Sequence, residues 1–240
     1  MTVSALMACY NRKEYVEKAV ESIEKQLSEE DELLISDDCS TDGTSEIIDA
    51  LSKKYKNIKV FHQSENLGVD KNMTFLFDNA KNDIFIICDS DDISLDGRVE
   101  TITKELEENN KISVIYSNGE VIDETGKIVS NDFFKSFRQK DSLINQLIHT
   151  TYFGTFFAFK KDFYIRIRSK FLSNQKEPWD RRIGFIAKRN NEICFLNKKL
   201  IKYRRWTGNV SVQHFSFKYS AKGTPMVSLR EFVIGPVLYG

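Results

Sequence analysis

The sequence predicts an α/β protein with a doubly wound, mainly parallel sheet, helices on both faces and a C-terminal extension. Four short apolar runs, at residues 2–9, 32–36, 58–62 and 84–88, alternate with segments whose apolar residues recur at helical spacing. The fourth run is apolar throughout, which is typical of a strand buried on both faces. Short connections favour right-handed crossovers, so the carboxyl ends of the strands should meet at one edge of the sheet.

The other elements follow from local patterns. Helical stripes occur at 13–27, 47–55, 73–80 and 99–106, and we interpret them as core packing. After residue 109, short strands with glycine turns replace this pattern, which is typical of antiparallel hairpins. We expect, in chain order, strands at 113–117 and 120–123 around an Asn118-Gly119 turn, a turn at 124–126, a helix at 143–148, a strand at 153–159 on the far edge of the sheet, a helix at 179–188, and either two short strands or one bulged strand at 193–203.

The composition of the 240 residues is that of a soluble globular protein, with 41% hydrophobic and 29% charged residues. The formal net charge is zero, which argues against a protein that holds nucleic acid by bulk electrostatics. The four cysteines are far apart and form no CxxC pair, so they predict neither a zinc site nor a disulfide framework. No leader-like segment precedes the first strand and no apolar segment approaches ~20 residues, so we expect a cytoplasmic protein.

Three carboxylates, Asp89, Asp91 and Asp92, directly follow the buried run at 84–88. Acids packed this closely repel one another unless a cation lies among them, and Mg²⁺ or Mn²⁺ prefers such oxygen ligands. The alternative is a solvated acidic turn that begins the next helix. Asn11, Asp38 and Asp91 each follow the end of a predicted strand, so the topology should bring their loops together in one crevice.

Four ordered stretches of the first half resemble the family 2 nucleotide-sugar glycosyltransferases, which have the GT-A fold. Residues 2–12 (TVSALMACYNR) resemble the opening strand of that family, and 36–44 (SDDCSTDGT) resemble its second signature. Residues 66–72 (NLGVDKN) resemble the third signature, and 88–92 (CDSDD) correspond to the metal-binding DxD element. The match is closest to the branch of rhamnosyltransferases and similar enzymes of bacterial surface polysaccharides.

The second half resembles the family less closely. Residues 179–187 (WDRRIGFIA) lie where related enzymes carry a catalytic aspartate at a helix start, and 200–211 (LIKYRRWTGNVS) resemble the closing segment. The family often has His where this chain has Trp206, so Arg204 and Arg205 are candidate substitutes. The resemblance implies one GT-A domain at 1–210, with a nucleotide-sugar half at 1–109 and an acceptor half at 110–210, followed by a tail of unknown role at 211–240.

The resemblance further implies a metal-dependent, inverting glycosyltransferase. It would move a sugar from a UDP- or dTDP-sugar to a hydroxyl group of a glycan or lipid-linked glycan in bacterial cell-surface polysaccharide synthesis. Asp180 is the expected catalytic base, with Glu177 as the nearest alternative, and Asp91 and Asp89 are the expected ligands of Mn²⁺ or Mg²⁺. The expected nucleotide-sugar contacts are Ala8, Tyr10, Asn11, Arg12, Asp38, Lys71, Asp89, Ser90, Asp91 and Arg204, with Arg98 as a further cation near the diphosphate.

Other interpretations of these residues remain open. Asp38 would also suit an Asx-turn with Ser40 or Thr41, and Asp180 would suit the first turn of a helix. For the whole chain, the alternative is a nucleotide-sugar-binding protein without transfer activity. A nucleotidyltransferase or a dinucleotide-binding dehydrogenase fits poorly, because no glycine-rich loop follows the first strand. A lipid-linked acceptor would bring the protein to the inner face of the membrane as a peripheral protein, and the aromatic and basic tail suits that location.

Overall fold

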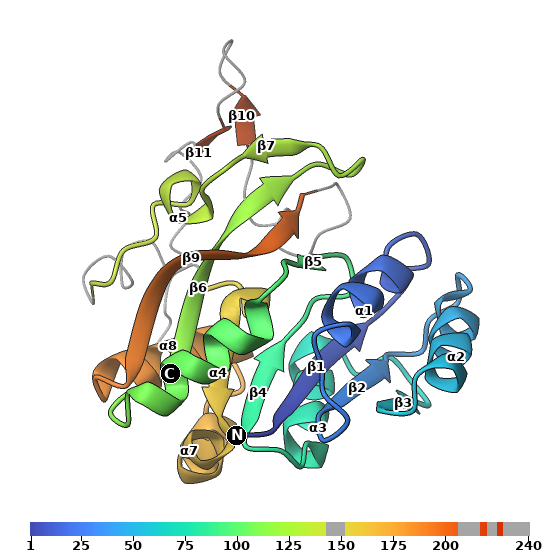
Figure 1. The fold of residues 1–240 in the computed structure, drawn as a ribbon, viewed down its shortest axis with the longest axis horizontal. Coiled ribbons are helices and arrows are strands. Elements are labelled where there is room, and N and C mark those ends of the chain that lie inside the picture. The colour runs from blue at the N-terminus through green and yellow to red at the C-terminus, as the bar shows by residue number, and fades with distance from the viewer. Residues whose placement is uncertain (143–151, 206–216, 220–224, 228–240) are drawn as a thin grey trace, which may run out of the picture.

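The computed structural model describes residues 1–142, 152–205, 217–219 and 225–227, and its centre is a nine-stranded sheet (Figure 1). The strands of this sheet are β1 (Val3–Cys9), β2 (Glu32–Asp37), β3 (Ile58–His62), β4 (Ile84–Ile87), β5 (Ile93–Ser94), β6 (Val114–Ile122), β7 (Ile128–Ser130), β8 (Phe157–Lys160) and β9 (Ile193–Arg204). Their order is β3-β2-β1-β4-β8-β6-β9-β5, with β7 paired to β6. The first four strands are parallel to one another, and β6 is parallel to β9. The predicted α/β class with a mainly parallel sheet is confirmed.

Helices cover both faces of this sheet (Figure 1). They are α1 (Val16–Glu24), α2 (Thr44–Lys54), α3 (Val69–Asn79), α4 (Arg98–Glu108), α5 (Phe133–Ser136), α7 (Lys161–Ser173) and α8 (Trp179–Arg189), with a 3-10 turn η1 (Gly154–Phe156). α1 and α4 lie on one face, where Gln26 Oε1 accepts a hydrogen bond from the main-chain N of Arg98 at 2.9 Å. α3, α7 and α8 pack together on the other face, where the ring of Phe77 contacts those of Phe171 and Trp179.

The alternation of strands and helices predicted for the first half is confirmed element by element. Its apolar stripes supply the core: the buried side chains of α1 include Val16, Val20 and Ile23, at helical spacing. Among the described elements, β7, α5 and α7 were not predicted, and neither was the two-residue strand β5, which pairs with β9 on the edge of the sheet. A strand this short leaves no periodic pattern in the sequence.

The predicted hairpin around Asn118-Gly119 is wrong, because β6 runs straight through it. The register between β6 and β9 shifts on either side of Asn118, so the pair marks a bulge inside the sheet. A Cβ on Gly119 would lie 2.6 Å from the main-chain O of Ile201, so only glycine fits this close approach. The amide of Asn118 is buried and donates to Asp132 and Asn197. The hairpin turn lies at 124–126 instead, as predicted, and connects β6 to β7.

The aromatic run at 153–159 was expected on the far edge of the sheet, and this position is also wrong. Its first part forms η1, and its last part forms β8, which lies between β4 and β6 and is antiparallel to both. Phe157 and Phe159 are fully buried, and their rings contact those of Tyr116 and Phe77, respectively. Of the two alternatives for 193–203, the single bulged strand is confirmed.

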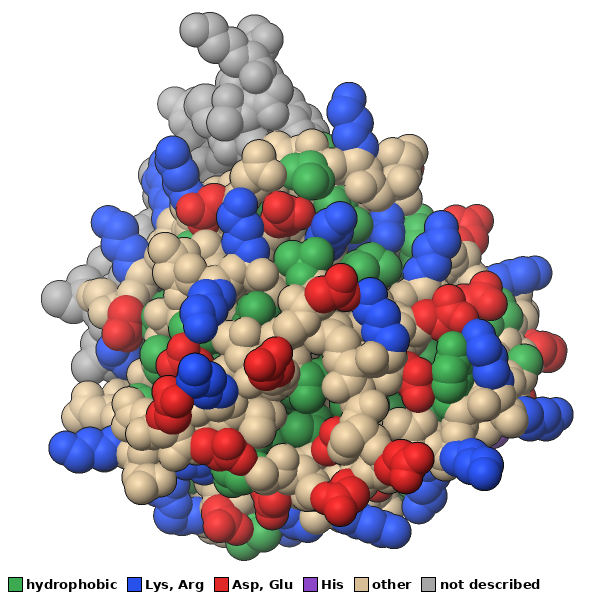
Figure 2. Space-filling model, in the orientation of Figure 1, with side chains coloured by type: hydrophobic (Ala, Val, Ile, Leu, Met, Phe, Trp, Pro, Cys, Tyr) green, Lys and Arg blue, Asp and Glu red, His purple; other side chains and the backbone are tan. Residues whose placement is uncertain are grey.

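Several expectations concern the remaining parts of the chain. The helix at 143–148 and Trp206 lie outside the described residues. In the tail, β10 (Phe217–Tyr219) and β11 (Pro225–Val227) form a separate two-stranded antiparallel sheet. No helix in the described ranges is both long and apolar enough to cross a membrane. Basic and acidic side chains are interspersed over the face shown in Figure 2, without a large region of one sign.

Candidate active site

Three loops meet at the carboxyl edge of the parallel strands. The loop after β1 contacts the loop after β2 through Asn11, whose main-chain N donates to Ser40 Oγ at 2.9 Å and whose Oδ1 accepts from Thr41 N at 2.9 Å. The main-chain N of Asp38 donates to the carbonyl of Cys9 at 2.9 Å, at the ends of the same two strands. Arg12, also in the loop after β1, lies 3.3 Å from Asp91 in the loop after β4, so the predicted convergence of the three loops is confirmed.

Asp38 connects this pair of loops to the start of α3. Its two carboxylate oxygens accept from the main-chain N of Leu67 at 2.7 Å and of Gly68 at 2.9 Å, and its side chain is buried. The Asx-turn interpretation of Asp38 is therefore wrong, and the preceding residue, Asp37, accepts from Ser40 instead. A carboxylate has further lone pairs to offer, so a contact of Asp38 with the nucleotide remains a prediction.

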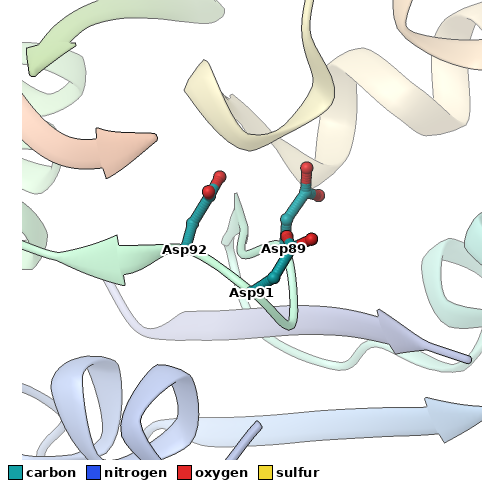
Figure 3. Close-up of side chains that lie close together, drawn as sticks. All are labelled: Asp89, Asp91 and Asp92. Carbon is teal, nitrogen blue, oxygen red and sulfur yellow. The ribbon is translucent and has the colours of Figure 1, made fainter. Parts of the chain in front are cut away.

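The carboxylates of Asp89, Asp91 and Asp92 lie together in the loop between β4 and β5 (Figure 3). One oxygen from each lies within 4.8 Å of the other two. Asp91 and Asp92 are buried, and Asp89 is partly exposed. Burial and repulsion by Asp91 raise the pKa of Asp89 to about 7, and the same causes raise the pKa of Asp92 well above its ordinary value. The loop thus concentrates acids where their charges are costly.

Arginines surround this cluster at three positions. Arg12 Nε lies 3.3 Å from Asp91 Oδ2. Arg204 holds the loop from the side of β9: its Nε donates to the carbonyl of Asp91 at 2.8 Å and its main-chain N donates to Asp92 Oδ1 at 2.7 Å. Arg98 is 1% exposed and donates to the carbonyl groups of residues 87 and 155, so the expectation that it contacts a diphosphate is wrong. The buried guanidinium group of Arg98 instead attracts the carboxylates of Asp92 and Asp89.

The cluster fits a divalent cation. Asp92 Oδ2 is buried and has no hydrogen-bond partner among the described residues, which is costly for a carboxylate oxygen unless a cation or water binds it. Carboxylate oxygens are the ligands that Mg²⁺ and Mn²⁺ prefer. Asp92 does not begin a helix, because α4 starts six residues later at Arg98. The sequence analysis named Asp91 and Asp89 as the expected ligands without Asp92, although all three carboxylates belong to the cluster.

Asp180 lies in the first turn of α8, as predicted. Its Oδ1 accepts from the main-chain N of Arg181 at 2.7 Å. Burial, followed by repulsion from Asp70 and Asp89, raises the pKa of Asp180 to about 7. Asp89 of the carboxylate loop thus contributes to the raised pKa of Asp180. Glu177, the alternative base, instead forms an exposed ion pair with Arg181 at 2.8 Å.

The other predicted contacts lie around the same edge. Tyr10 is 44% exposed and Lys71 is exposed, whereas Ser90 is buried in the carboxylate loop. Ala8 is the second-last residue of β1, beside Ser36 of β2. Their roles in binding remain predictions. Two residues were missed by sequence reasoning: Asp70 and Arg182, which contact each other 112 residues apart and left no local pattern.

The sequence of this chain is similar to those of known proteins. The sequence model of glycosyl transferase family 2 matches residues 4–168, which include the three converging loops and the carboxylate cluster. The chain belongs to glycosyl transferase family 2. Among curated relatives, glycosyltransferase GlyG of Streptococcus pneumoniae is 25% identical over 233 residues, covering 91% of this chain and 75% of that protein. A GalNAc(5)-diNAcBac-PP-undecaprenol beta-1,3-glucosyltransferase of Campylobacter jejuni is 28% identical over 183 residues, covering 74% of this chain and 58% of its own.

Solved structures of glycosyltransferases share the fold. S. aureus TarS 1-349 in complex with UDP-GlcNAc matches with a TM-score of 0.70 and 21% identity, covering 90% of this chain and 62% of that chain. The mannosyltransferase PcManGT of Pyrobaculum calidifontis, in complex with GDP-Man and Mn²⁺, matches with a TM-score of 0.58 and 14% identity, covering 82% and 54%. This family 2 chain thus spans less than two thirds of either solved chain, and the likeness establishes the GT-A fold.

Proposed function

We propose that this chain transfers a sugar from a UDP-sugar, or a dTDP-sugar, to a hydroxyl group of a glycan, with inversion at the anomeric carbon. One observation carries the proposal: oxygens of Asp89, Asp91 and Asp92 lie within 4.8 Å of one another beside Arg12, at the edge where α/β sheets bind ligands. The contribution of Asp89 to the raised pKa of Asp180 supports Asp180 as the base that acts beside this cluster.

The donor side of the crevice supports a nucleotide diphosphate. Arg12 and the carboxylate cluster supply positive charge and potential cation ligands next to each other. Tyr10 presents an exposed ring at the end of β1, and Asp38 supplies hydrogen-bond acceptors for ribose or base. We choose UDP as the first nucleotide to test, because the TarS structure contains UDP-GlcNAc.

Asp89, Asp91 and Asp92 would hold Mn²⁺ or Mg²⁺. When bound, such a cation neutralises the negative charge that develops on a leaving diphosphate. Arg12 is placed to share that charge, since its guanidinium group already lies beside Asp91. Arg204 keeps the loop in place through the Asp91 carbonyl and, in this proposal, contacts the nucleotide only indirectly.

Asp180 is the proposed base. The acceptor oxygen forms a bond to the anomeric carbon while the bond from that carbon to the diphosphate oxygen breaks. The electron pair of the broken bond leaves with the nucleoside diphosphate, and the acceptor proton passes to Asp180. A carboxylate with a pKa of about 7 suits this transfer at neutral pH. Attack from the side opposite the leaving group inverts the anomeric configuration.

We further propose a lipid-linked glycan as the acceptor class, because one curated relative is described as acting on an undecaprenol-linked glycan. Synthesis of bacterial cell-surface polysaccharide at the inner face of the membrane, by a cytoplasmic or peripheral protein, would match such an acceptor. In this arrangement residues 1–109 hold the donor and 110–210 the acceptor. The boundary falls between α4 and β6.

A thermal-shift screen tests the donor proposal. UDP, dTDP, GDP and CMP are each added with Mn²⁺, Mg²⁺ or EDTA, because a ligand that binds only the folded state raises the melting temperature by mass action. We expect UDP or dTDP to raise the melting temperature and EDTA to abolish this rise. In a separate turnover assay, the protein should then release the same nucleotide from its sugar conjugates. Binding without hydrolysis or transfer across a panel of acceptors would favour a protein that only binds nucleotide sugars. No shift with any nucleotide would contradict the proposal.

A further inference from the structure

The helix that carries Asp180 has no N-terminal cap from its own segment. α8 begins after Pro178, whose side chain accepts no hydrogen bond. The acceptor comes from α3 instead: Asp70 Oδ1 accepts from the main-chain N of Trp179 at 2.8 Å. A carboxylate at a helix N-terminus is also favoured by the helix dipole. The start of α8 is therefore fixed by a residue 109 positions earlier in the chain.

The same carboxylate binds a second group of α8. Asp70 Oδ2 accepts from the guanidinium group of Arg182 at 3.0 Å, and the Arg182 side chain is 5% exposed. Arg182 also donates to the carbonyl of Phe171 at 2.7 Å and lies 4.1 Å from the centre of its ring. Because Asp70 contacts α8 at two positions, it fixes both the place of the helix and its rotation about its axis.

Asp180 lies in sequence between Trp179 and Arg182, the two residues of α8 that Asp70 contacts. Asp70 itself belongs to the first turn of α3. Two residues before it, the main-chain N of Gly68 donates to Asp38 at 2.9 Å. A continuous set of contacts thus leads from the loops of the nucleotide crevice through the start of α3 to the start of α8. A shift of α3 moves Asp180 with it.

We propose that Asp70 is a positioning residue for glycosyl transfer, which holds the first turn of α8 so that Asp180 faces the acceptor hydroxyl. This inference rests on the proposed function, in which Asp180 is the base. Asp70 itself touches neither donor nor acceptor in this proposal. Its removal should therefore lower the rate of the chemical step without weakening nucleotide binding.

The chain offers a matched control. Asp78, at the other end of α3, also joins two groups of a neighbouring helix, because it accepts from Tyr164 Oη at 2.8 Å and from Arg168 Nε at 2.9 Å on α7. The kcat of Asp78→Asn therefore shows how much activity is lost when a contact of α3 away from α8 is weakened. Asp70→Asn keeps an acceptor for Trp179 and loses the charge that pairs with Arg182, and Asp70→Ala loses both.

The experiment measures UDP or dTDP release from the sugar nucleotide that the wild-type protein turns over, together with the dissociation constant of that nucleotide with Mn²⁺. We expect kcat to fall about 10-fold in Asp70→Asn and about 100-fold in Asp70→Ala, the range reported for misplaced catalytic groups. In both Asp70 variants, the donor KM and the dissociation constant of the nucleotide should stay within about twofold of wild type, because the contacts of Asp70 do not reach the donor. In Asp78→Asn, kcat should also stay within about twofold of wild type. Wild-type kcat in Asp70→Ala, or a matching loss of nucleotide binding, would overturn the proposal.

Hydrogen–deuterium exchange of residues 179–183 provides a readout that does not depend on activity. Exchange should become faster in Asp70→Ala and stay unchanged in Asp78→Asn, because Asp70, and not Asp78, accepts the hydrogen bond from the main-chain N of Trp179. Unchanged exchange in Asp70→Ala would overturn the proposal. A wild-type rate in Asp180→Asn would instead refute the proposed function, and the positioning role would fall with it. Loss of activity in Asp180→Asn with full activity in Asp70→Ala would refute the positioning role alone.

Discussion

Arg12 and Asp91 join the loop after β1 to the carboxylate loop after β4, with 3.3 Å between Arg12 Nε and Asp91 Oδ2. Both side chains are largely buried, at 17% and 8% exposure, so water screens the pair only in part. The guanidinium group thus lies where it stabilises the carboxylate and also opposes a cation bound to it.

The first prediction concerns this opposition. Arg12→Gln should bind Mn²⁺ in the absence of nucleotide about 3- to 10-fold more tightly than wild type, since removal of one partly buried charge is worth roughly 1 kcal/mol. The same variant should bind UDP less tightly, because a positive partner of the diphosphate is lost. Titration calorimetry measures both affinities, and Arg12→Lys, which keeps the charge, is the control. Unchanged Mn²⁺ affinity in Arg12→Gln would show that the pair does not influence the cation site.

The second prediction concerns the cation ligands. Asp91→Asn should lose the Mn²⁺-dependent part of the thermal shift caused by nucleotide, because an amide is a weaker and uncharged ligand. Without ligand, its melting temperature should stay close to that of wild type, since relief of the repulsion from Asp89 and Asp92 offsets the lost ion pair with Arg12. Asp96→Asn is a matched control, because Asp96 lies nearby and its side chain is 85% exposed. A full metal-dependent shift in Asp91→Asn would remove Asp91 from the cation site.

The third prediction concerns the pH dependence of turnover. Asp180 accepts a proton only when it is ionised, and its pKa is about 7, so kcat/KM should rise between pH 6 and 8 and then level off. A cation among the acids offsets the repulsion from Asp89, so the rise should lie at lower pH with Mn²⁺ bound. Rates across this range, at saturating Mn²⁺ and at low Mn²⁺, test both statements. A rate that falls as the pH rises from 6 to 7 would contradict a base at this position.

The fourth prediction concerns the stability of the folded protein. The raised pKa of Asp180 should make the free energy of unfolding fall with rising pH, whereas kcat/KM should rise. The ordinary pKa of aspartate in an unfolded chain is about 3.9, so the folded protein binds more protons than the unfolded chain between roughly pH 4 and 7. The free energy of unfolding should therefore decrease as the pH rises through this window. Asp180→Asn removes the ionisation, so its melting temperature should exceed that of wild type by a few degrees at pH 8 and differ little at pH 4.5. Thermal unfolding in EDTA measures this, and a lower melting temperature at pH 8 would contradict it.

The fifth prediction concerns the packing beneath Asp180. A Cβ on Gly154 would lie 2.4 Å from Cζ2 of Trp179, so Gly154→Ala should displace the indole and destabilise the protein by about 1–3 kcal/mol. Because Trp179 precedes Asp180, kcat should fall as well. The double variant Gly154→Ala with Trp179→Phe removes the clashing ring atoms and should recover part of the stability relative to Gly154→Ala. Urea unfolding of the set measures this, and an additive loss in the double variant would contradict the steric explanation.

The first half of the fold could be predicted from the sequence because each element leaves a local signal. The run at 84–88 is apolar for its full length, and the acids after it lie where parallel strands end. The second half could be predicted only in part: the helix at 179–188 and the bulged strand at 193–203 are present, but the course of the other strands depends on distant contacts. Asn118-Gly119 has the composition of a turn, yet the glycine is required by the approach of the Ile201 carbonyl from another strand. The aromatic run at 153–159 gave no information about its neighbours, which turned out to be β4 and β6.

The same distinction applies to the candidate site. Asp89, Asp91 and Asp180 could be selected because short motifs contain them. The role of Asp70 could not, since its partners lie 109 and 112 residues away and its spacing resembles that of an ordinary first-turn acid. Arg98 was misplaced for a related reason: a single arginine in a helix gives no sign that the fold buries it completely.

The central claim is that Asp180 accepts the proton from the acceptor while the carboxylate loop holds the donor. It is tested most directly by Asp180→Asn, with release of nucleotide from the active sugar donor measured beside binding of that nucleotide with Mn²⁺. We predict that kcat falls by about 10²- to 10⁴-fold, the usual contribution of a positioned base, and that the dissociation constant of the nucleotide changes less than twofold. Turnover at the wild-type rate would show that another group accepts the proton, and loss of nucleotide binding would show that Asp180 belongs to the donor site.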